Sequence, residues 1–518
     1  MIEIFELDGH RIGCFNMDGH EIGLPNLIKM EKDHLELADL IISKPLSYPF
    51  RHINQKGDMR ASHHIRLSRG LPIQVARRIQ SKNAAIGEGG DVTMVYLSGY
   101  KELDDAFIDS LEEAKIFMFE YDDARSLFDA FFRIREKHPN SMCYCDCGPD
   151  AVPVLAYAGF DLFKDTEDNR RALEKFLEEK TPQYVEMSAC SSLGAKTLLD
   201  HLYLNYWNEF EKYVSQPRSK EMYISRDSFW RPVVQRWAKS VKAHYDPGRR
   251  VFLLLPCSSR KPYSDSPSHR RFIDVIRSVL GNAYPSICQL IVTSPYGVVP
   301  RELETLIDYD IVVTGKWTSE EVGRSADMLK TIVSSAEDPI VIAHLPENEL
   351  DVIQELEAKV LITTDGHPLS DDSLKNLKEA LAYVKDELDV PKDKYGDVRM
   401  LSKFLYGSDI FPEKIYIKGR GIKQVFAEGR AIASLTKGLR PLASDVDVTR
   451  RYVDIDFEVK GDLFCVGVKD AEDGIRPGDE VVIRRNGRSM AVGTAVLPGD
   501  MMKKMRKGKA VKIRKRFD

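Results

Sequence analysis

Residues 253–272, LLLPCSSRKPYSDSPSHRRF, gather side chains that could perform nucleophilic chemistry in one short loop. Cys257 directly follows an apolar run, and a thiolate at this position could act as the nucleophile. The neighbouring cations predict a lowered pKa for this thiol: Arg260, Lys261 and His269. Lys261 could instead bind a phosphate or a carboxylate, and His269 could act as an acid or a base.

Serines in the same loop are spaced two residues apart, at Ser264, Ser266 and Ser268. This spacing suits an extended segment that wraps around a polar ligand. The alternative is a Ser/Pro turn with a buried cysteine and a residue that caps the next helix. The density of functional groups directly after a strand favours a binding site.

Two later loops could complete such a site. In TSPYGVVPRELE, Arg301 and Glu302 could bind the charged ends of a substrate. The alternative is a helix start, because Pro300 and Glu302 are both typical of a first turn. In VVTGKWTSEE, Trp317 could stack on a base, or it could belong to the core.

The elements that must position these loops alternate between strands and helices over residues 250–388. Apolar strands are predicted at 250–256, 287–293, 310–314, 339–344 and 359–364. Helical segments between them predict a doubly wound sheet with parallel strands. Cys257 then lies just beyond the carboxyl end of the first strand, where open α/β sheets place their ligands.

The chain of 518 residues is too long for one core, so about three to five domains are expected. Residues 93–180 alternate strands with helices, including a predicted helix at 103–114, and residues 195–244 are mostly helical. We expect an α/β domain at 1–185, a helical linker region at 186–245, an α/β catalytic core at 246–388, a small α+β domain at 389–444 and a C-terminal domain rich in short strands at 445–518.

The charge distribution indicates a nucleic-acid partner. The net charge of −5 argues weakly against a uniformly basic protein, yet the last 18 residues carry nine Lys or Arg and one Asp. The alternation in AVKIRKRF favours a strand with one basic face over a solubilising tail. The candidate RNA-binding residues are Lys503, Lys504, Arg506, Lys507, Lys512 and Arg514.

Eight cysteines in so long a chain are not a disulfide framework, which favours a reducing cytoplasm. No apolar run approaches the roughly 20 residues of a membrane helix, and the N-terminus lacks the pattern of a signal peptide. Cys143, Cys145 and Cys147 are too tightly spaced for a structural zinc site. Cys190 and His201 are too few, so no metal is predicted.

The motif PCSSRKPYSDSPSH resembles the signature of the archaeosine synthase family: Pro-Cys, three residues, Lys-Pro-Tyr, two residues, Ser, two residues, His. Its fixed positions match at Pro256, Cys257, Lys261, Pro262, Tyr263, Ser266 and His269. The segments SPYGVVPRELE and YDIVVTGKW are similar to those that follow the motif in that family.

The rest of the chain resembles the archaeal tRNA-guanine transglycosylases, and KGDLFCVGVKDAEDGIRPGDEVVIRRNGRSMAVGTAV resembles a PUA domain, which is an RNA-binding module. The resemblance implies a multidomain α/β and α+β protein with a degenerate TIM-barrel-like N-terminal domain, a doubly wound α/β core, a small α+β domain and a C-terminal PUA β-barrel. A complete TIM barrel typically needs about 250 residues. Only residues 1–185 are available, and the family's zinc cluster is reduced to Cys190 and His201. The resemblance therefore implies a catalytically silent first domain and no zinc cofactor.

The resemblance implies an enzyme that adds an amine to the nitrile of 7-cyano-7-deazaguanine at position 15 of tRNA. Lysine or glutamine would supply the nitrogen, a radical-SAM enzyme would be a partner, and relatives suggest a homodimer. Cys257 would add to the nitrile carbon to give a thioimidate, and His269 would shuttle protons. Lys261, Tyr263 and Ser266 would bind the base, the donor or a phosphate. Direct attack by the donor amine is the alternative.

Two other functions remain open at this point. The first is an active tRNA-guanine transglycosylase, which would exchange guanine and bind zinc. The second is a tRNA-binding subunit without catalytic activity, which would have no use for the crowded loop around Cys257.

Overall fold

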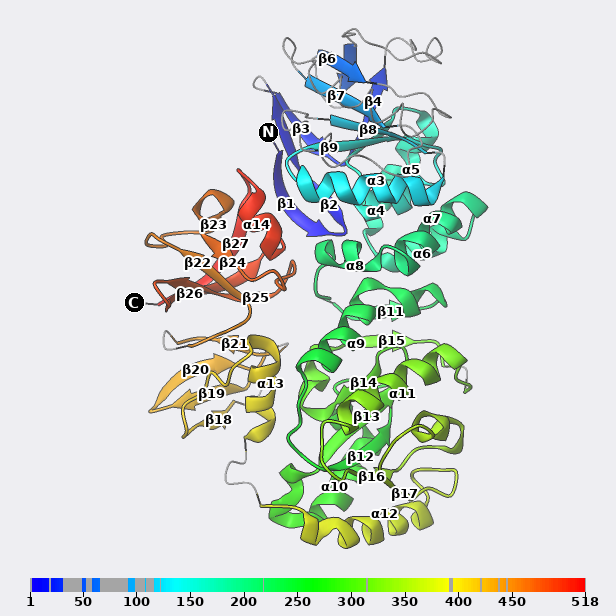
Figure 1. The fold of residues 1–518 in the computed structure, drawn as a ribbon, viewed down its shortest axis with the longest axis vertical. Helices are drawn as coiled ribbons and strands as arrows, with labels where there is room; N and C mark the ends of the chain where they lie inside the picture. The colour runs from blue at the N-terminus through cyan, green and yellow to red at the C-terminus, as the bar shows by residue number, and fades with distance from the viewer. Residues whose placement is uncertain are drawn as a thin grey trace. The chain divides into compact units, whose positions relative to one another are not determined.

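A computed structural model gives the arrangement of the chain in Figure 1. It describes residues 2–17, 20–30, 49–52, 58–65, 92–97, 108, 116–121, 123–217, 219–313, 315–390, 395–419, 422–436, 438–443 and 446–517. The chain forms two compact units: a first unit of Met1–Gln216, Val453–Asp479 and Gly493–Ile513, and a second unit of Pro217–Tyr452, Glu480–Val492 and Arg514–Asp518. The division into five segments stays a prediction.

The first unit begins with an antiparallel sheet of strands β1 (Ile2–Asp8), β2 (His10–Met17) and β3 (His20–Leu24). Asp8 pairs with His10 across Gly9, as expected for an Asp-Gly turn. Gly9 has a φ of 71°, and a Cβ there would lie 2.6 Å from the carbonyl oxygen of Tyr157. The turn therefore requires glycine both for its backbone conformation and for its packing.

Seven strands of the first unit close into a barrel in the order β10-β4-β5-β6-β7-β8-β9. Their bounds are β4 (Asn26–Met30), β5 (Pro49–His52), β6 (Asp58–Ile65), β7 (Val92–Leu97), β8 (Ile116–Glu120), β9 (Met142–Asp146) and β10 (Leu162–Lys164). β5 is antiparallel to both of its neighbours, and the other pairs are parallel. The barrel thus departs from the uniform parallel order of a complete TIM barrel.

The helices of this unit agree with the predicted alternation, although the helix expected at 103–114 lies outside the described residues apart from Ile108. The described helices are α3 (Ala124–Lys137), α4 (Val152–Ala158), α5 (Glu167–Glu179), α6 (Pro182–Ala189), α7 (Leu193–Leu204) and α8 (Trp207–Phe210). Asp123 and Thr166 cap α3 and α5 through their side-chain oxygens.

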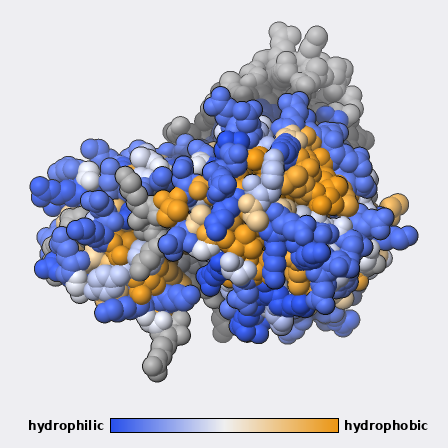
Figure 2. Space-filling view, turned by 90° about the horizontal axis from the view of Figure 1, so that it is seen from below, coloured by the Kyte–Doolittle hydropathy of each residue, from blue (hydrophilic) through white to orange (hydrophobic). Residues whose placement is uncertain are grey.

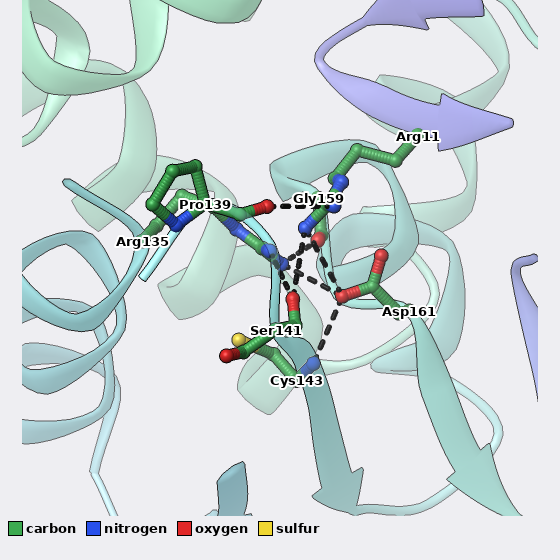
Figure 3. Close-up of polar contacts among 7 residues, drawn as sticks. All are labelled: Arg11, Arg135, Pro139, Ser141, Cys143, Gly159 and Asp161. Carbon is green, nitrogen blue, oxygen red and sulfur yellow. Dashed lines mark hydrogen bonds and ion pairs between the residues drawn. The ribbon is translucent and has the colours of Figure 1, made fainter. Parts of the chain in front are cut away.

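Asp161, which precedes β10, joins distant parts of the first unit in a buried polar network (Figure 3). Its Oδ2 accepts hydrogen bonds from Arg135 Nη2 and from the Cys143 amide, each at 2.8 Å. Arg11 Nη1 lies 3.5 Å from the same oxygen and also donates to the carbonyl of Ser141. Breaking such a buried pair costs about 3–5 kcal/mol, so this network is a structural element of the unit.

The second unit is built on a five-stranded sheet in the order β14-β13-β12-β16-β17. The strands are β12 (Val251–Pro256), β13 (Cys288–Thr293), β14 (Gly297–Pro300), β16 (Ile340–Ala343) and β17 (Lys359–Ile362). All neighbours are parallel except β13 and β14. The central strand β12 is buried on both faces, as its continuous apolar sequence predicts.

Helices cover both faces of this sheet, giving three layers (Figure 1). Val251, Leu253 and Leu255 pack with α10 (Pro267–Leu280) and α12 (Asp371–Val384). Phe252 and Leu254 face the opposite way, toward the core with α9 (Pro232–His244) and α11 (Ser319–Val333). The alternation follows from the two-residue period of a strand.

The strand predicted at 310–314 does not belong to this sheet, so that prediction is wrong. Its place is taken by β14, which folds back from β13 through the turn at Gly297. The predicted segment contributes only β15 (Tyr309–Ile311), which pairs with β11 (Glu221–Tyr223) in a separate two-stranded sheet. The short turn after β13 favours antiparallel pairing of β14 with β13 at the sheet edge.

Two smaller sheets follow in the chain. A four-stranded sheet contains β18 (Tyr416–Lys418), β19 (Gln424–Ala427), β20 (Arg430–Ser434) and β21 (Arg440–Pro441), preceded by α13 (Gly396–Tyr406). A six-stranded sheet has the order β23-β27-β26-β25-β22-β24. Its elements are β22 (Tyr452–Ile455), β23 (Leu463–Phe464), β24 (Asp470–Ala471), β25 (Glu480–Arg485), β26 (Arg488–Ala495), α14 (Gly499–Lys504) and β27 (Lys509–Arg516). The strand predicted from AVKIRKRF is thus confirmed as part of β27.

On the face that Figure 2 shows, hydrophobic residues reach the surface in separate patches among hydrophilic ones. Within the described ranges, no helix has both the length and the apolar character that crossing a membrane requires.

Candidate active site

The topology of the second unit places the Cys257 loop at a switch point. From β12 the chain runs to β13 on one side, and it later returns to β16 on the other side of β12. In open α/β sheets, ligands bind outside the carboxyl ends of the strands at this reversal. The loops that follow β12, β13 and β16 therefore define a candidate active site.

Cys257 follows β12 and is exposed. The residue as a whole is exposed, yet desolvation raises the pKa of its thiol, and the neighbouring Glu349 carboxylate raises it further. A hydrogen bond with Thr293 and the charge of Lys261 act in the opposite direction. The expected lowering of the thiol pKa is therefore wrong in sign, since burial outweighs the nearby cation.

Lys261 is the predicted cation that the structure brings to the thiol. Its Nζ lies 3.8 Å from the centre of the Tyr309 ring and 5.7 Å from that of Tyr263. Such a position over an aromatic face is favourable for an ammonium group. Burial lowers the pKa of Lys261, whereas Cys257 and Asp310 raise it.

A cluster of hydroxyl groups lies beneath this lysine. The fully buried Tyr263 hydroxyl is 3.2 Å from Thr293 Oγ1 and 3.0 Å from the Tyr309 hydroxyl. The distance between Thr293 Oγ1 and the Tyr309 hydroxyl oxygen is 2.6 Å. Tyr263 thus supports the lysine from within the core rather than presenting its hydroxyl to solvent. Tyr309, on β15, was not singled out by the sequence.

His269 and Ser266 lie at the start of α10. Ser266 is the N-cap residue, and its Oγ accepts a hydrogen bond from the His269 amide at 3.2 Å. The His269 ring is buried, with Nε2 2.9 Å from the carbonyl of Pro256 and Nδ1 2.8 Å from Arg301 Nη2. Burial and the Arg301 charge lower the pKa of His269 to about 3. The neutral ring therefore donates from Nε2 and accepts at Nδ1, which does not fit the expected proton shuttle.

Arg301 connects to both ends of the Cys257 loop through hydrogen bonds. Its predicted role was to bind a charged end of a substrate. It reaches the Pro256 end through His269. At the other end its Nη1 donates to Glu304 at 2.9 Å, and Glu304 accepts from the Ser264 amide at 3.0 Å.

Glu302 does not reach the loop. It pairs with Arg249 and accepts a hydrogen bond from the Tyr245 hydroxyl, which also contacts Cys288 at the amino end of β13. The neighbouring Arg301 and Glu304 reach the Cys257 loop, whereas the Glu302 carboxylate is engaged by Arg249 and Tyr245. The substrate contact of Glu302 stays a prediction that these contacts do not support. Trp317 is partly buried and packs against the core of the second unit.

Glu349 is a site residue that the sequence did not indicate. It belongs to the 3-10 helix η7 (Glu347–Ile353), which follows β16, and only 7% of it is exposed. The sequence predicts only a helical segment between the strands at 339–344 and 359–364, and this pattern does not single out Glu349. Only the pairing of β16 beside β12 brings Glu349 close to Cys257, and no local pattern signals that pairing.

The predicted RNA-binding residues are all exposed, and some of them contact other protein groups. Lys503 Nζ lies 2.6 Å from Asp473, and Lys504 donates to the Glu136 carbonyl at 3.2 Å. Arg514 Nε donates to Glu480 at 2.9 Å. For Arg506, Lys507 and Lys512, no ion pair is found among the described residues.

The cysteines outside the loop do not assemble a metal site in the described residues, where no three His, Cys, Asp or Glu side chains could hold an ion together. Cys143 and Cys145 are buried in β9, while Cys147 is partly exposed. Cys190 is exposed after α6, and His201 Nδ1 lies 2.8 Å from Asn205 Nδ2.

Known proteins resemble this chain over most of its length. Residues 234–381 match a family described as a domain of unknown function (DUF5591), and residues 454–517 match the PUA domain family. The chain is 33% identical over 459 residues to the archaeosine synthase subunit alpha of Thermococcus kodakarensis, covering 78% of this chain and 80% of that protein.

Two further relatives extend this comparison. The archaeosine synthase of Methanocaldococcus jannaschii is 32% identical over 441 residues, which cover 74% of this chain and 76% of the relative. The tRNA-guanine(15) transglycosylase of Methanothermobacter thermautotrophicus is 25% identical over 343 residues, covering 60% of this chain and 46% of that protein.

Proposed function

Because this chain belongs to the archaeosine synthase family, we propose that it acts in the archaeosine modification of tRNA. The reaction adds an amine to the nitrile of 7-cyano-7-deazaguanine at position 15 and yields an amidine or its amino-acid adduct. The observation that carries the proposal is the Cys257 thiol, open at the switch point and flanked by Lys261.

The chemistry of the loop suits a nitrile. A nitrile carbon is electrophilic, and a thiolate can add to it to form a thioimidate, which an amine then displaces. Lys261 favours the thiolate through its charge, because it lowers the pKa of Cys257 against the effect of burial. Cys257 is therefore the nucleophile of the proposed reaction.

Other predicted residues position this nucleophile. His269 and Arg301 hold the carbonyl of Pro256, the residue before Cys257, and Ser266 caps the helix that carries His269. Tyr263 supports Lys261 through its buried ring. These contacts suit a rigid loop whose reactive atoms are fixed before the substrate arrives.

The PUA domain and the exposed basic residues suit the tRNA partner. Arg506, Lys507 and Lys512 lie in or beside β27 and would contact phosphates. Trp317, half-buried near the edge of the second unit's core, would contact the base or the nucleotide beside it.

The remaining partners are proposals from the resemblance. Lysine or glutamine would supply the nitrogen, and the relative from Thermococcus kodakarensis is named as a subunit alpha, which suits work with a second, radical-SAM enzyme. We also propose a homodimer and a reaction without resident zinc. Gel filtration with light scattering and elemental analysis would test these two points.

The decisive experiment incubates the full-length protein with tRNA that carries 7-cyano-7-deazaguanine and with lysine or glutamine in separate reactions. Mass spectrometry of the digested nucleosides should show a lysine adduct or the amidine in one of them. Conversion of guanine-bearing tRNA by base exchange would instead support a transglycosylase. Binding of tRNA without any product would support a subunit without catalytic activity.

A further inference from the structure

Glu349 presents an unpaired acid to the candidate active site. It lies in η7, directly after β16, and its backbone amide donates to the Pro346 carbonyl at 2.9 Å. The residue is more than nine-tenths buried, yet its Oε2 has no hydrogen-bond partner among the residues that the structure describes. A buried carboxyl oxygen without a partner is costly, so its retention calls for an explanation.

Two observations place this carboxyl in the neighbourhood of the reacting sulfur. The segment after β16 is fixed beside β12, because the His344 amide donates to the Leu254 carbonyl at 3.1 Å. The Glu349 carboxylate is also close enough to Cys257 to raise the pKa of its thiol. Glu349 and Cys257 thus follow the two adjacent strands that form the switch point.

We propose that Glu349 is the proton-transfer residue of this site, which moves a proton between the Cys257 sulfur and the nitrile nitrogen. The inference rests on the proposed function and deepens it. It also supplies the proton-transfer role that His269 cannot fill, since both ring nitrogens of His269 are engaged.

The first step balances without any further reactant. The Cys257 thiol gives its proton to Glu349 Oε2, and the sulfur lone pair forms a bond to the nitrile carbon. One π pair of the C≡N bond moves onto nitrogen, which takes the proton from Glu349. The products are a thioimidate with an N–H group and a regenerated carboxylate.

The second step reverses the proton flow. The lone pair of the donor amine forms a bond to the thioimidate carbon, and the C–S bond breaks with its electron pair on sulfur. Glu349 takes a proton from the amine nitrogen and returns it to the thiolate. The products are an amidine and the free Cys257 thiol, with no change of oxidation state.

Burial raises the pKa of Glu349 to about 7. Near neutral pH this carboxyl is therefore present in both forms, and an acid–base group works best when its pKa is close to the working pH. A carboxylate in ordinary solvent would be almost fully ionised and a poor proton donor.

The test follows adduct formation in the absence of any amine donor. Full-length protein is mixed with nitrile-bearing tRNA, and the covalent protein–tRNA product is measured over time on denaturing gels across a pH series. The matched variants are Glu349→Gln and Glu347→Gln, because Glu347 is an exposed carboxylate in the same short helix. Glu349→Asp serves as the conservative variant.

We expect Glu349→Gln to slow adduct formation by about 10²–10⁴-fold and to remove the rate dependence near pH 7. Glu349→Asp should recover part of the rate, and Glu347→Gln should match the unaltered protein. Thermal unfolding and tRNA binding, measured on every variant, show that each is folded and binds substrate.

Each other outcome is informative. An unchanged adduct rate with Glu349→Gln overturns the inference and leaves the proposed function standing. A normal adduct rate with slow transfer to the donor also overturns it, and assigns Glu349 to donor binding. Modification of the tRNA without any covalent protein–tRNA product would exclude the covalent step, and with it the proposed role of Glu349. An unaltered protein that never modifies nitrile-bearing tRNA overturns the proposed function itself.

Discussion

The ammonium of Lys261 lies over the Tyr309 ring, 3.8 Å from its centre. The two residues belong to different sheets. Lys261 lies in the loop after β12 of the five-stranded sheet, and Tyr309 lies in β15 of the two-stranded sheet. Tyr309 is fully buried and donates its hydroxyl to the Ser294 carbonyl at 3.0 Å, so its ring is a fixed platform. The lysine charge is thereby held beside Cys257 without an ion-pair partner that would neutralise it among the described side chains.

Replacement of Cys257 tests the covalent route. We expect Cys257→Ala and Cys257→Ser to lose turnover on nitrile-bearing tRNA by about 10³-fold or more, because the nucleophile is removed or weakened. Binding of tRNA, measured by filter retention, should stay unchanged, since a thiol carries no positive charge that could attract a phosphate. Full activity in both variants would contradict the thioimidate.

Opposite charges beside the thiol should shift its titration in opposite directions. Lys261→Met removes a cation that lowers the pKa of Cys257, so the pKa should rise. Glu349→Gln removes an anion that raises it, so the pKa should fall. The rate of Cys257 alkylation by iodoacetamide as a function of pH measures both shifts.

The control for these shifts is Arg260→Met. Arg260 is exposed and precedes Lys261 in the chain, and it is not one of the charges with the largest effects on the pKa of Cys257. Its replacement should leave the alkylation profile in place. A shift equal to that of Lys261→Met would show that any nearby cation acts on the thiol.

Glu349 should lower the stability of the folded protein at neutral and higher pH. Its folded pKa of about 7 lies above the ordinary value of 4.5, so the folded state binds more protons between these values. Stability is therefore lost as the pH rises from 4.5 through 7. We expect Glu349→Gln to raise the free energy of unfolding at pH 8 by about 2–3 kcal/mol, measured by urea denaturation. Glu347→Gln should change it by no more than about 0.5 kcal/mol.

His269 should make the protein less stable in acid. Its folded pKa of about 3 lies below the ordinary 6.5, so the unfolded chain binds more protons between pH 6.5 and 3. Stability is fully present above pH 6.5 and falls as the pH is lowered. His269→Gln should flatten this decline in urea titrations from neutral to acidic pH, and the exposed His367→Gln should not. The pKa of His344 is also lowered, to about 4, so some loss of stability in acid should remain in both variants.

Exposed and paired basic residues should respond differently to substitution. Replacing Arg506, Lys507 or Lys512 with Gln should weaken tRNA binding and reduce the slope of log affinity against log salt by about 0.7–0.9 per lost phosphate contact. Arg514→Gln should instead lower stability, because Glu480 loses its hydrogen-bonded partner and keeps only Arg440 at 3.9 Å. Filter binding over a salt series, together with thermal unfolding, separates the two effects.

The sequence predicted the central strand and the site at its end because both signals are local. A continuous apolar run gives β12, and the reactive loop follows it directly. The contributions of Glu349 and Tyr309 depend on which strands pair, and no residue near Cys257 in sequence reveals that. The sign of the Cys257 pKa shift was also missed, since burial is decided by the packing of the whole sheet.

Some predicted site residues make structural contacts, and their roles at a site stay predictions. Ser266 and His269 begin a helix, and the N-cap and the buried ring serve that helix and its neighbours. Glu302 lies one residue after Arg301, yet its carboxylate pairs with Arg249. A cluster of polar residues in sequence thus indicates where a site lies more reliably than which of its members meets a ligand.

The Asp161 network has a consequence for the order in which the chain folds. Arg11 and Asp161 are 150 residues apart in sequence, so their contact closes a very long loop. A second contact spans an even longer stretch of sequence, because the Gly9 amide donates to the Tyr213 carbonyl at 2.8 Å. Loop closure of this length is slow and is completed late. The first strands of the chain must therefore wait, during synthesis, for residues beyond 213 before their final partners exist.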